Sequence, residues 1–126
     1  MYFLKTEDSF SSAHALRGYK GKCENIHGHN WRVIVTVKGD KLDEIGLLID
    51  FHELKTYVRD ILSVLDHKNI NEEVPFFTAN NPSSENLASF IYENLSSKLS
   101  EYGKNRVIVD SIEVFESEKC SCIYKP

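Results

Sequence analysis

The chain has 126 residues, 41% of them hydrophobic and 27% charged, which is the composition of a soluble globular protein. Its net charge of -4 argues against a general nucleic-acid-binding surface and against attraction to an acidic membrane. Lys5, Glu7 and Asp8 interrupt any signal-peptide apolar segment, and no apolar stretch is long enough to span a bilayer. Two of the 3 cysteines are too close in sequence for an easy disulfide, so we expect a reduced, cytoplasmic protein.

Two strands are expected at the start of the chain. The first covers residues 2–14 and the second covers 26–38, where β-branched residues dominate; a loop rich in glycine and lysine joins them. Asp50 is then placed to cap a helix over 51–64, because Glu53 occupies the capping-box position and apolar residues follow at helical spacing. The first half of the chain therefore predicts two strands and one helix.

The second half of the chain predicts one more helix and two more strands. We expect a loop through Pro75, after which Asn81 and Pro82 open the second helix, since proline suits a helix's first turn. A third strand over 106–117 and a short fourth strand over 121–124 follow. The order ββααββ predicts a single α+β domain over the whole chain, with the helices on one face of an antiparallel sheet.

Three histidines form the candidate metal site. His27 and His29 lie on one face of the second strand, because side chains alternate along a strand, and Gly28 keeps the position between them free of bulk. His14 ends the first strand, where pairing of the two strands would bring it to the same spot. Three imidazoles without a cysteine favour a catalytic zinc site with an open position over a closed structural site. The alternative is partly exposed strand histidines, and we interpret His52, in a helix's first turn, as solvated surface.

Cys23 lies in the loop just before the second strand. A thiol near a divalent cation would favour its thiolate form and could then act as a base, although an ordinary loop cysteine remains the alternative. Basic residues share this loop and could attract a polyphosphate, or could simply be solvated. They are Arg17, Lys20 and Lys22.

Asp66 and His67 follow the last apolar residue of the first predicted helix. Neighbours in sequence do not face each other on a helix. Beyond the helix end, the carboxylate of Asp66 could orient the imidazole of His67 as an acid or base. The alternative, which the pair alone favours, is a histidine that interacts with the helix dipole.

Glu116 stands where an apolar residue would be expected. Strand alternation places it on the same face as Ile108, Ile112 and Val114. A buried carboxylate needs hydrogen-bond donors, and a flat heterocycle with two adjacent N–H groups, such as the amino-pyrimidinone edge of a pterin, would satisfy both of its oxygens. The alternative is a solvated strand end.

Taken together and in this order, these motifs resemble the 6-pyruvoyltetrahydropterin synthase and 6-carboxy-tetrahydropterin synthase superfamily. The matching segments are residues 10–14, 23–29, 49–51, 65–67 and 81–85, with Glu116 and 122–124 at the end of the chain. The resemblance covers nearly the whole chain and implies the tunnelling fold. In that fold, subunits join their sheets into a barrel, usually as trimers stacked into hexamers, with pockets between subunits. A homo-oligomer of this kind would also protect the free edges of the sheet.

The resemblance implies roles for individual residues. The family's zinc ligands fall on His14, His27 and His29. Its catalytic groups fall on Cys23 as the proton-abstracting cysteine, on Asp66 and His67 as the relay, and on Glu116 as the pterin anchor, sometimes described as part of the relay. The segment that lines the pterin pocket falls on Ser83, Ser84 and Glu85.

The spacing between Cys23 and His27 points to one branch of the superfamily. Three residues separate them, which looks like the bacterial 6-carboxy-tetrahydropterin synthases of the queuosine and deazapurine pathway. The resemblance then implies a zinc-dependent lyase that converts 7,8-dihydroneopterin triphosphate to 6-carboxy-5,6,7,8-tetrahydropterin, with release of triphosphate and acetaldehyde. The alternatives are 6-pyruvoyltetrahydropterin synthase activity on the same substrate and a non-catalytic pterin- or purine-binding zinc protein.

Overall fold

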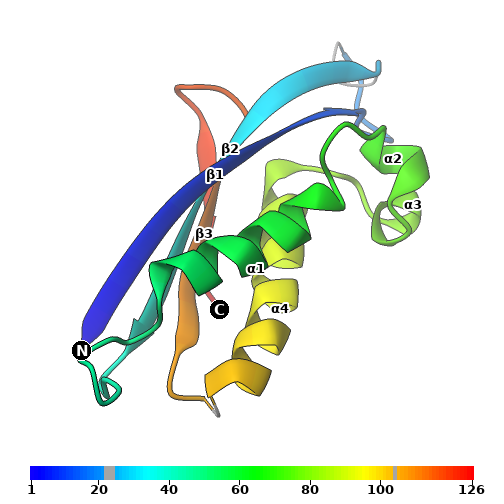
Figure 1. Ribbon diagram of the computed structural model, residues 1–126. Helices are drawn as coiled ribbons and strands as arrows, with labels where there is room; N and C mark the ends of the chain where they lie inside the picture. The colour runs from blue at the N-terminus through cyan, green and yellow to red at the C-terminus, as the bar shows by residue number, and fades with distance from the viewer. Residues whose placement is uncertain (22–24, 104) are drawn as a thin grey trace.

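The computed structural model describes residues 1–21, 25–103 and 105–126. Its elements in chain order are β1 (Tyr2–His14), β2 (His27–Gly39), α1 (Phe51–Ser63), α2 (Ile70–Glu73), α3 (Phe76–Ala79), α4 (Ser84–Gly103), β3 (Ile108–Phe115) and β4 (Ser121–Tyr124) (Figure 1). The strands form one antiparallel sheet in the order β1-β2-β3-β4. The predicted α+β class is therefore confirmed, and the sheet of the single chain is open.

The hairpin of β1 and β2 sets the frame of the molecule. The two strands pair along all 13 residues of each, from Tyr2 opposite Gly39 to His14 opposite His27. Because cross-strand partners share a face of the sheet, every second residue of β2 is buried from Trp31 onward. The end of this hairpin carries all three candidate metal ligands.

The helices α1 and α4 cover one face of the sheet, and no helix of the described residues lies on the opposite face (Figure 1). Burial of each large apolar side chain between these layers stabilises the fold by about 1.5–3 kcal/mol. Fully buried members of this core include Trp31, Val33, Val35, Leu54, Leu62, Leu87, Ile91 and Leu95. None of the helices in the described ranges is long and apolar enough to cross a membrane.

Helix α1 begins as the sequence predicts. The carboxylate of Asp50 accepts the backbone N–H of His52 at 2.7 Å and so caps the helix. The side chain of His52 is exposed, in agreement with its interpretation as solvated surface. The helix ends at Ser63, one residue before the predicted end.

The connection from α1 to α4 differs from the prediction. The segment expected to be a loop contains the short helices α2 and α3, whose four residues each are too few to show helical periodicity. The prediction that Pro82 opens the second long helix was wrong, because α4 begins at Ser84. Ser83 caps α4 instead, with its hydroxyl accepting the N–H of Asn86 at 3.2 Å. Pro82 therefore precedes the helix.

Strand β3 contains a bulge that changes which side chains face the core. Thr36 pairs with Ser111 and Val37 with Val109, so Asp110 is an extra residue in the ladder. The prediction that Ile108 shares the face of Ile112 was wrong, since Ile108 is 44% exposed and Val109 is buried in its place. Beyond the bulge the alternation holds, and it aims Glu116 toward the helix-covered face.

Candidate functional site

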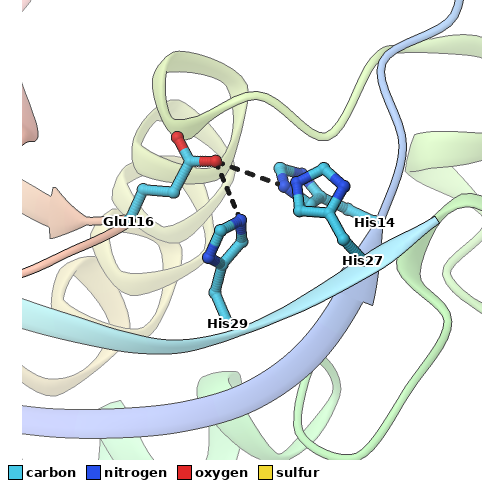
Figure 2. Close-up of side chains that lie close together, drawn as sticks. All are labelled: His14, His27, His29 and Glu116. Carbon is cyan, nitrogen blue, oxygen red and sulfur yellow. Dashed lines mark ion pairs between the residues drawn. The ribbon is translucent and has the colours of Figure 1, made fainter. Parts of the chain in front are cut away.

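Three histidines converge at the end of the β1–β2 hairpin (Figure 2). His14 pairs directly with His27, and His29 pairs with Ser12, so that strand alternation puts the three imidazoles on the same face. The ring centroids of the three histidines lie 4.6–5.1 Å apart. Together with Glu116 they offer four ligand atoms that all lie within 4.8 Å of one another. This group could hold a metal ion.

Backbone carbonyls fix the orientation of two of these rings. The Nδ1 atom of His14 lies 2.7 Å from the carbonyl oxygen of Pro82, and Nδ1 of His27 lies 2.7 Å from that of Asn25. A carbonyl oxygen only accepts, so each Nδ1 carries the hydrogen and each Nε2 presents its lone pair. Histidine ligands of protein metal sites are oriented by the same kind of contact. The arrangement therefore suits coordination through Nε2.

The environment keeps His14 neutral. Its side chain is 1% exposed, and this burial is the main cause that lowers its pKa; the hydrogen bond to Pro82 and the Glu116 carboxylate act in the opposite direction. The neighbouring His27 and His29 also lower the pKa of His14, because they oppose a further positive charge. A neutral imidazole is the form that binds a metal ion.

Trp31 forms the floor of the histidine cluster. Its ring is completely buried and lies 4.8 Å from the ring of His14 and 5.2 Å from that of His29, centroid to centroid. Both contacts are edge-on. This aromatic side chain excludes water from beneath the cluster, which strengthens electrostatic interactions between the ligand atoms and a bound cation.

Glu116 completes the cluster from the end of β3 (Figure 2). Its Oε1 lies 3.4 Å from Nε2 of His14 and 3.0 Å from Nε2 of His29. Both nitrogen atoms are buried and lack a hydrogen-bond partner within the described part of the chain. Buried polar atoms are normally satisfied, so orphaned nitrogens that face a carboxylate fit a cation between them. The sequence analysis placed Glu116 on this face but did not foresee its contact with the histidines.

The segment before α4 is attached to the metal cluster through Pro82, whose carbonyl holds His14. Ser83, Ser84 and Glu85, the residues predicted to line a pterin pocket, follow directly in the chain. Ser83 and Ser84 are half-buried and Glu85 is exposed. The structure thus brings this segment beside the metal cluster, and its contact with a pterin remains a prediction.

The sequence analysis did not foresee the long-range contacts of three residues in the connections, although it named two of them, Arg17 and Asn81, for other reasons. The side chain of Asn71 accepts the N–H of Ala15 and donates to its carbonyl, both at 2.8 Å, and Asn81 makes the same pair of bonds to Arg17 at 2.9 Å. The guanidinium of Arg17 donates to the backbone carbonyl of Phe77 at 2.6 Å, so this side chain is anchored to the helical connection. The Asn–Pro turn alone gives no signal for these long-range bonds.

Asp66 and His67 lie in contact, with 3.0 Å between Oδ2 and Nδ1, so the carboxylate is placed to orient the imidazole. The pair docks on β1, since Asp66 Oδ1 accepts the N–H of Ser11 at 2.9 Å and the N–H of His67 donates to the Ser11 carbonyl at 2.6 Å. His67 adopts a positive φ of 56°, and its side chain is 84% exposed. His67 is not one of the four residues of the described metal cluster. The single chain orients this imidazole but leaves it in solvent.

Two features of the cysteines follow from the structure. Cys23, the predicted base, lies outside the described residues, as does Lys22, and no position is assigned to them. The described cysteines, Cys120 and Cys122, are not joined to each other. Burial raises the pKa of the Cys122 thiol, with the Glu85 carboxylate as a second cause, so this thiol is held in its protonated form.

Comparison with known proteins identifies the family of this chain. The family model described as 6-pyruvoyl tetrahydropterin synthase matches residues 3–126. A protein of Archaeoglobus fulgidus, provisionally named a 6-carboxy-5,6,7,8-tetrahydropterin synthase, is 39% identical over 90 residues, covering 71% of this chain and 72% of that protein. The human 6-pyruvoyl tetrahydrobiopterin synthase is 35% identical over 108 residues, covering 83% of this chain and 71% of that protein.

A solved structure supports the same relationship. The 6-pyruvoyl tetrahydropterin synthase of Caenorhabditis elegans superimposes with a TM-score of 0.86 at 30% identity, covering 99% of this chain and 95% of that one. The family model and the named relatives together identify a lyase-type pterin synthase. The chain belongs to the 6-pyruvoyl tetrahydropterin synthase family.

Proposed function

We propose that this protein is a 6-carboxy-5,6,7,8-tetrahydropterin synthase. It converts 7,8-dihydroneopterin triphosphate and one water into 6-carboxy-5,6,7,8-tetrahydropterin, triphosphate and acetaldehyde. Queuosine and deazapurine biosynthesis would consume the pterin product. The observation that carries the proposal is the convergence of His14, His27 and His29 in a member of this family, with two of the three Nε2 atoms oriented by backbone carbonyls.

Zinc is the metal that this donor set favours. Three imidazoles match the three-ligand pattern of catalytic zinc sites, and no thiolate is contributed by the described cluster. When bound to His14, His27 and His29, the metal would polarise oxygen atoms of the substrate side chain as a Lewis acid. The buried ring of Trp31 would shield this region from water on the side of the core.

The remaining residues would position substrate and move protons. Glu116 would bind the amino-pyrimidinone edge of the pterin through its carboxylate, beside a pocket wall formed by residues 83–85. Cys23 would remove a proton from the side-chain carbon, and His67, oriented by Asp66, would return or accept a proton. A proton on such a carbon is only weakly acidic, so a positioned base is needed in addition to the metal.

The exposure of His67 supports a shared active site. The side chain of His67 is 84% exposed, so a second chain must lie over it to form an enclosed substrate site. The pair docks on β1, which is an edge strand of an open sheet. A neighbouring subunit that extends the sheet would cover both, since exposed strand edges invite pairing with another chain. We therefore infer a homo-oligomer, trimeric or hexameric, in which each site combines the metal cluster of one subunit with the relay of the next.

A second candidate is the 6-pyruvoyl tetrahydropterin synthase reaction on the same substrate. It is favoured by the human and Caenorhabditis elegans relatives, which carry that name. Both reactions would use the same metal and relay, and they differ in whether the side chain is cleaved. The short spacing between Cys23 and His27 is the feature that favours the carboxy product. A non-catalytic pterin- or purine-binding zinc protein would not need the oriented Asp66–His67 pair.

Mass spectrometry of the products tests these candidates. The zinc-loaded protein is incubated with 7,8-dihydroneopterin triphosphate, and 6-carboxytetrahydropterin with acetaldehyde is the expected result. A pyruvoyl-tetrahydropterin would identify the sister activity at the same site. Unchanged substrate, despite bound zinc and demonstrated pterin binding, would reject both enzymatic candidates.

The role proposed for Cys23 has its own test. Cys23→Ala should abolish turnover and leave the zinc content unchanged, because the thiol acts on the substrate and is not a ligand. Cys120→Ala is the matched control, since this exposed thiol lies in the β3–β4 connection. Undiminished turnover of Cys23→Ala would remove this residue from the mechanism.

A further inference from the structure

The Glu116 carboxylate is placed as a metal ligand and not as a hydrogen-bond partner of the histidines. Because Nδ1 of His14 donates to Pro82, its Nε2 presents a lone pair, and Oε1 of Glu116 faces that lone pair at 3.4 Å. Two acceptors in contact repel each other when buried. The same oxygen lies 3.0 Å from Nε2 of His29, which also has no hydrogen-bond partner among the described residues. A cation between these atoms would turn the repulsion into attraction.

The distances from Glu116 to two of the histidines are close to those between ligands of a tetrahedral site. Nitrogen and oxygen ligands about 2.0–2.1 Å from a tetrahedral zinc ion lie about 3.3–3.4 Å from one another. The two distances from Glu116 Oε1, 3.4 and 3.0 Å, fall at or just below this value. His27 supplies the remaining corner, with its Nε2 free because its Nδ1 donates to Asn25. All four ligand atoms lie within 4.8 Å of one another, so the single chain offers four candidate ligands that a bound ion would draw together.

Glu116 is also free to leave this position. It follows the last residue of β3, and its side chain is 35% exposed, in contrast to the 1% of His14. Its backbone is held by the N–H, which donates to the Cys120 carbonyl at 3.2 Å, so the side chain can turn while the chain stays fixed. A surface groove next to it, lined also by Asn30 and Phe115, gives the carboxylate space outside the cluster.

We propose that Glu116 is the fourth ligand of the metal in the resting protein and that a bound pterin draws this carboxylate away from the metal. The proposal rests on the proposed function, in which the same carboxylate binds the pterin edge. One carboxylate cannot serve both partners fully, so pterin binding opens a coordination position and the empty protein keeps it closed. Closed four-ligand sites are inert and open sites are reactive, so the exchange would restrict metal chemistry to the loaded protein.

Cobalt(II) substitution tests the resting state without any turnover. With a carboxylate as fourth ligand, the visible spectrum of the Co²⁺ protein should be constant from about pH 6 to 9, because no group on the metal titrates there. In Glu116→Gln, water fills the position and ionises somewhere around pH 7 to 9, so a spectral transition should appear. The affinity for Co²⁺ should also fall by at least about tenfold, since loss of even an outer partner of a ligand costs about 10–100-fold.

Two further variants separate ligation from charge. Glu116→Asp keeps the charge but withdraws the carboxylate by one methylene, about 1.5 Å. Direct ligation predicts that it behaves like Glu116→Gln, and a purely electrostatic role predicts that it behaves like the unmodified protein. Glu118→Gln is the matched control, because it removes the same charge from an exposed position of the same loop and should leave spectrum and affinity unchanged.

The exchange is tested by adding unsubstituted pterin, which offers the amino-pyrimidinone edge but no side-chain hydroxyls. Saturating pterin should introduce the pH-dependent transition into the spectrum of the unmodified Co²⁺ protein and change nothing further in Glu116→Gln. A flat spectrum despite saturated binding would overturn the exchange, and a transition already present without pterin would overturn the resting ligation. Failure of the unmodified protein to bind Co²⁺ or Zn²⁺ would instead reject the metal centre of the proposed function.

Discussion

The metal cluster and the Asp66–His67 pair both lie against β1, yet their surroundings are opposite. His14 ends the strand with its side chain 1% exposed, above the buried Trp31. His67 docks three residues earlier, on the backbone of Ser11, with its side chain 84% exposed. The cluster is therefore finished within one chain, whereas the pair is oriented by the chain but not enclosed by it.

This difference corresponds to two different requirements, those of metal ligands and those of an acid–base group. Metal ligands must be dry and rigid, so the hairpin register, the two carbonyl contacts and the aromatic floor hold them on the covered face of the sheet. An acid–base group needs contact with substrate, and enclosure by a second copy would supply it. The positive φ of His67 is a strained backbone conformation, and such strain is typically retained at functional sites, here where the imidazole must be oriented.

The largest expected effect is loss of the metal from the cluster. His29→Ala removes one of three imidazoles, and the zinc affinity should fall by at least about a hundredfold, because a direct ligand contributes more than the outer partners that are worth about 10–100-fold. Zinc stoichiometry after dialysis against a weak chelator measures this. His52→Ala is the control, since its side chain is exposed on α1. Equal zinc content in the two variants would contradict the assignment of His29.

Replacement of His67 should separate chemistry from metal binding. His67→Asn should lower turnover by about 10²–10⁴-fold, the usual contribution of a general acid or base, with zinc content unchanged. Asparagine is the suitable replacement because it tolerates the positive φ of 56° at this position, whereas alanine would add backbone strain of roughly 1–2 kcal/mol. Loss of zinc from this variant would show that cluster and pair are not independent.

A mixing experiment asks whether the two regions act across subunits. His29→Ala and His67→Asn are each inactive, but in mixed oligomers a site between two chains can combine an intact cluster with an intact relay. Random mixing of equal amounts should restore roughly a quarter of the unmodified rate, if each site spans one repeated interface. Mixtures that stay as inactive as the separate variants would place both parts of the site in the same chain.

Sequence patterns were sufficient for those parts of the fold that depend on local periodicity. The bounds of β1, the cap of α1 at Asp50 and the common face of His27 and His29 all follow from alternation, helical spacing and capping chemistry. His14 could be assigned to the same face because its strand pairs with β2 without any shift. These features need only short stretches of chain and the rules of regular structure.

Features that depend on contacts between distant segments could not be predicted. The bulge at Asp110 reverses the alternation of β3 and exposes Ile108, and nothing in the local sequence marks the extra residue. The carbonyl of Pro82 and the amide of Asn71 hold the cluster from the α1–α4 connection, but any residue offers a carbonyl. The contact of Glu116 with the histidines likewise requires the actual path of the chain at the end of β3.

A smaller effect concerns Gly28, which the sequence analysis interpreted as keeping the position between the two histidines free of bulk. The nearest atom to an added Cβ would be the Ser12 carbonyl oxygen at 3.9 Å, an ordinary contact, so the single chain does not require glycine here. Gly28→Ala should change stability by no more than about 0.5 kcal/mol and retain zinc. Gly39→Ala, whose Cβ would collide with the Arg106 carbonyl, should cost about 1–3 kcal/mol in the same thermal melts.

The smallest expected effect is the pH dependence that Asp66 adds to stability. The hydrogen bond from the Ser11 N–H is the main cause that lowers the pKa of this carboxyl. Desolvation raises this pKa, and the nearby His67 and Arg59 lower it further. A pKa lowered by folding stabilises the protein above the unfolded value of 3.8, and this stabilisation is lost as the pH falls through the lower, folded value.

Asp66→Asn removes this titration, so thermal midpoints of the variant and the unmodified protein should differ most between about pH 5 and 7 and converge as the pH falls below 3.8 through the lower, folded pKa. Asp60→Asn, an exposed carboxylate of α1, is the control and should show no such convergence. A difference for Asp66→Asn that is equally large at all these pH values would mean that the carboxylate charge contributes nothing at the β1 edge. The position of His67 would then depend on the backbone bond from its N–H to the Ser11 carbonyl and not on the charge of Asp66.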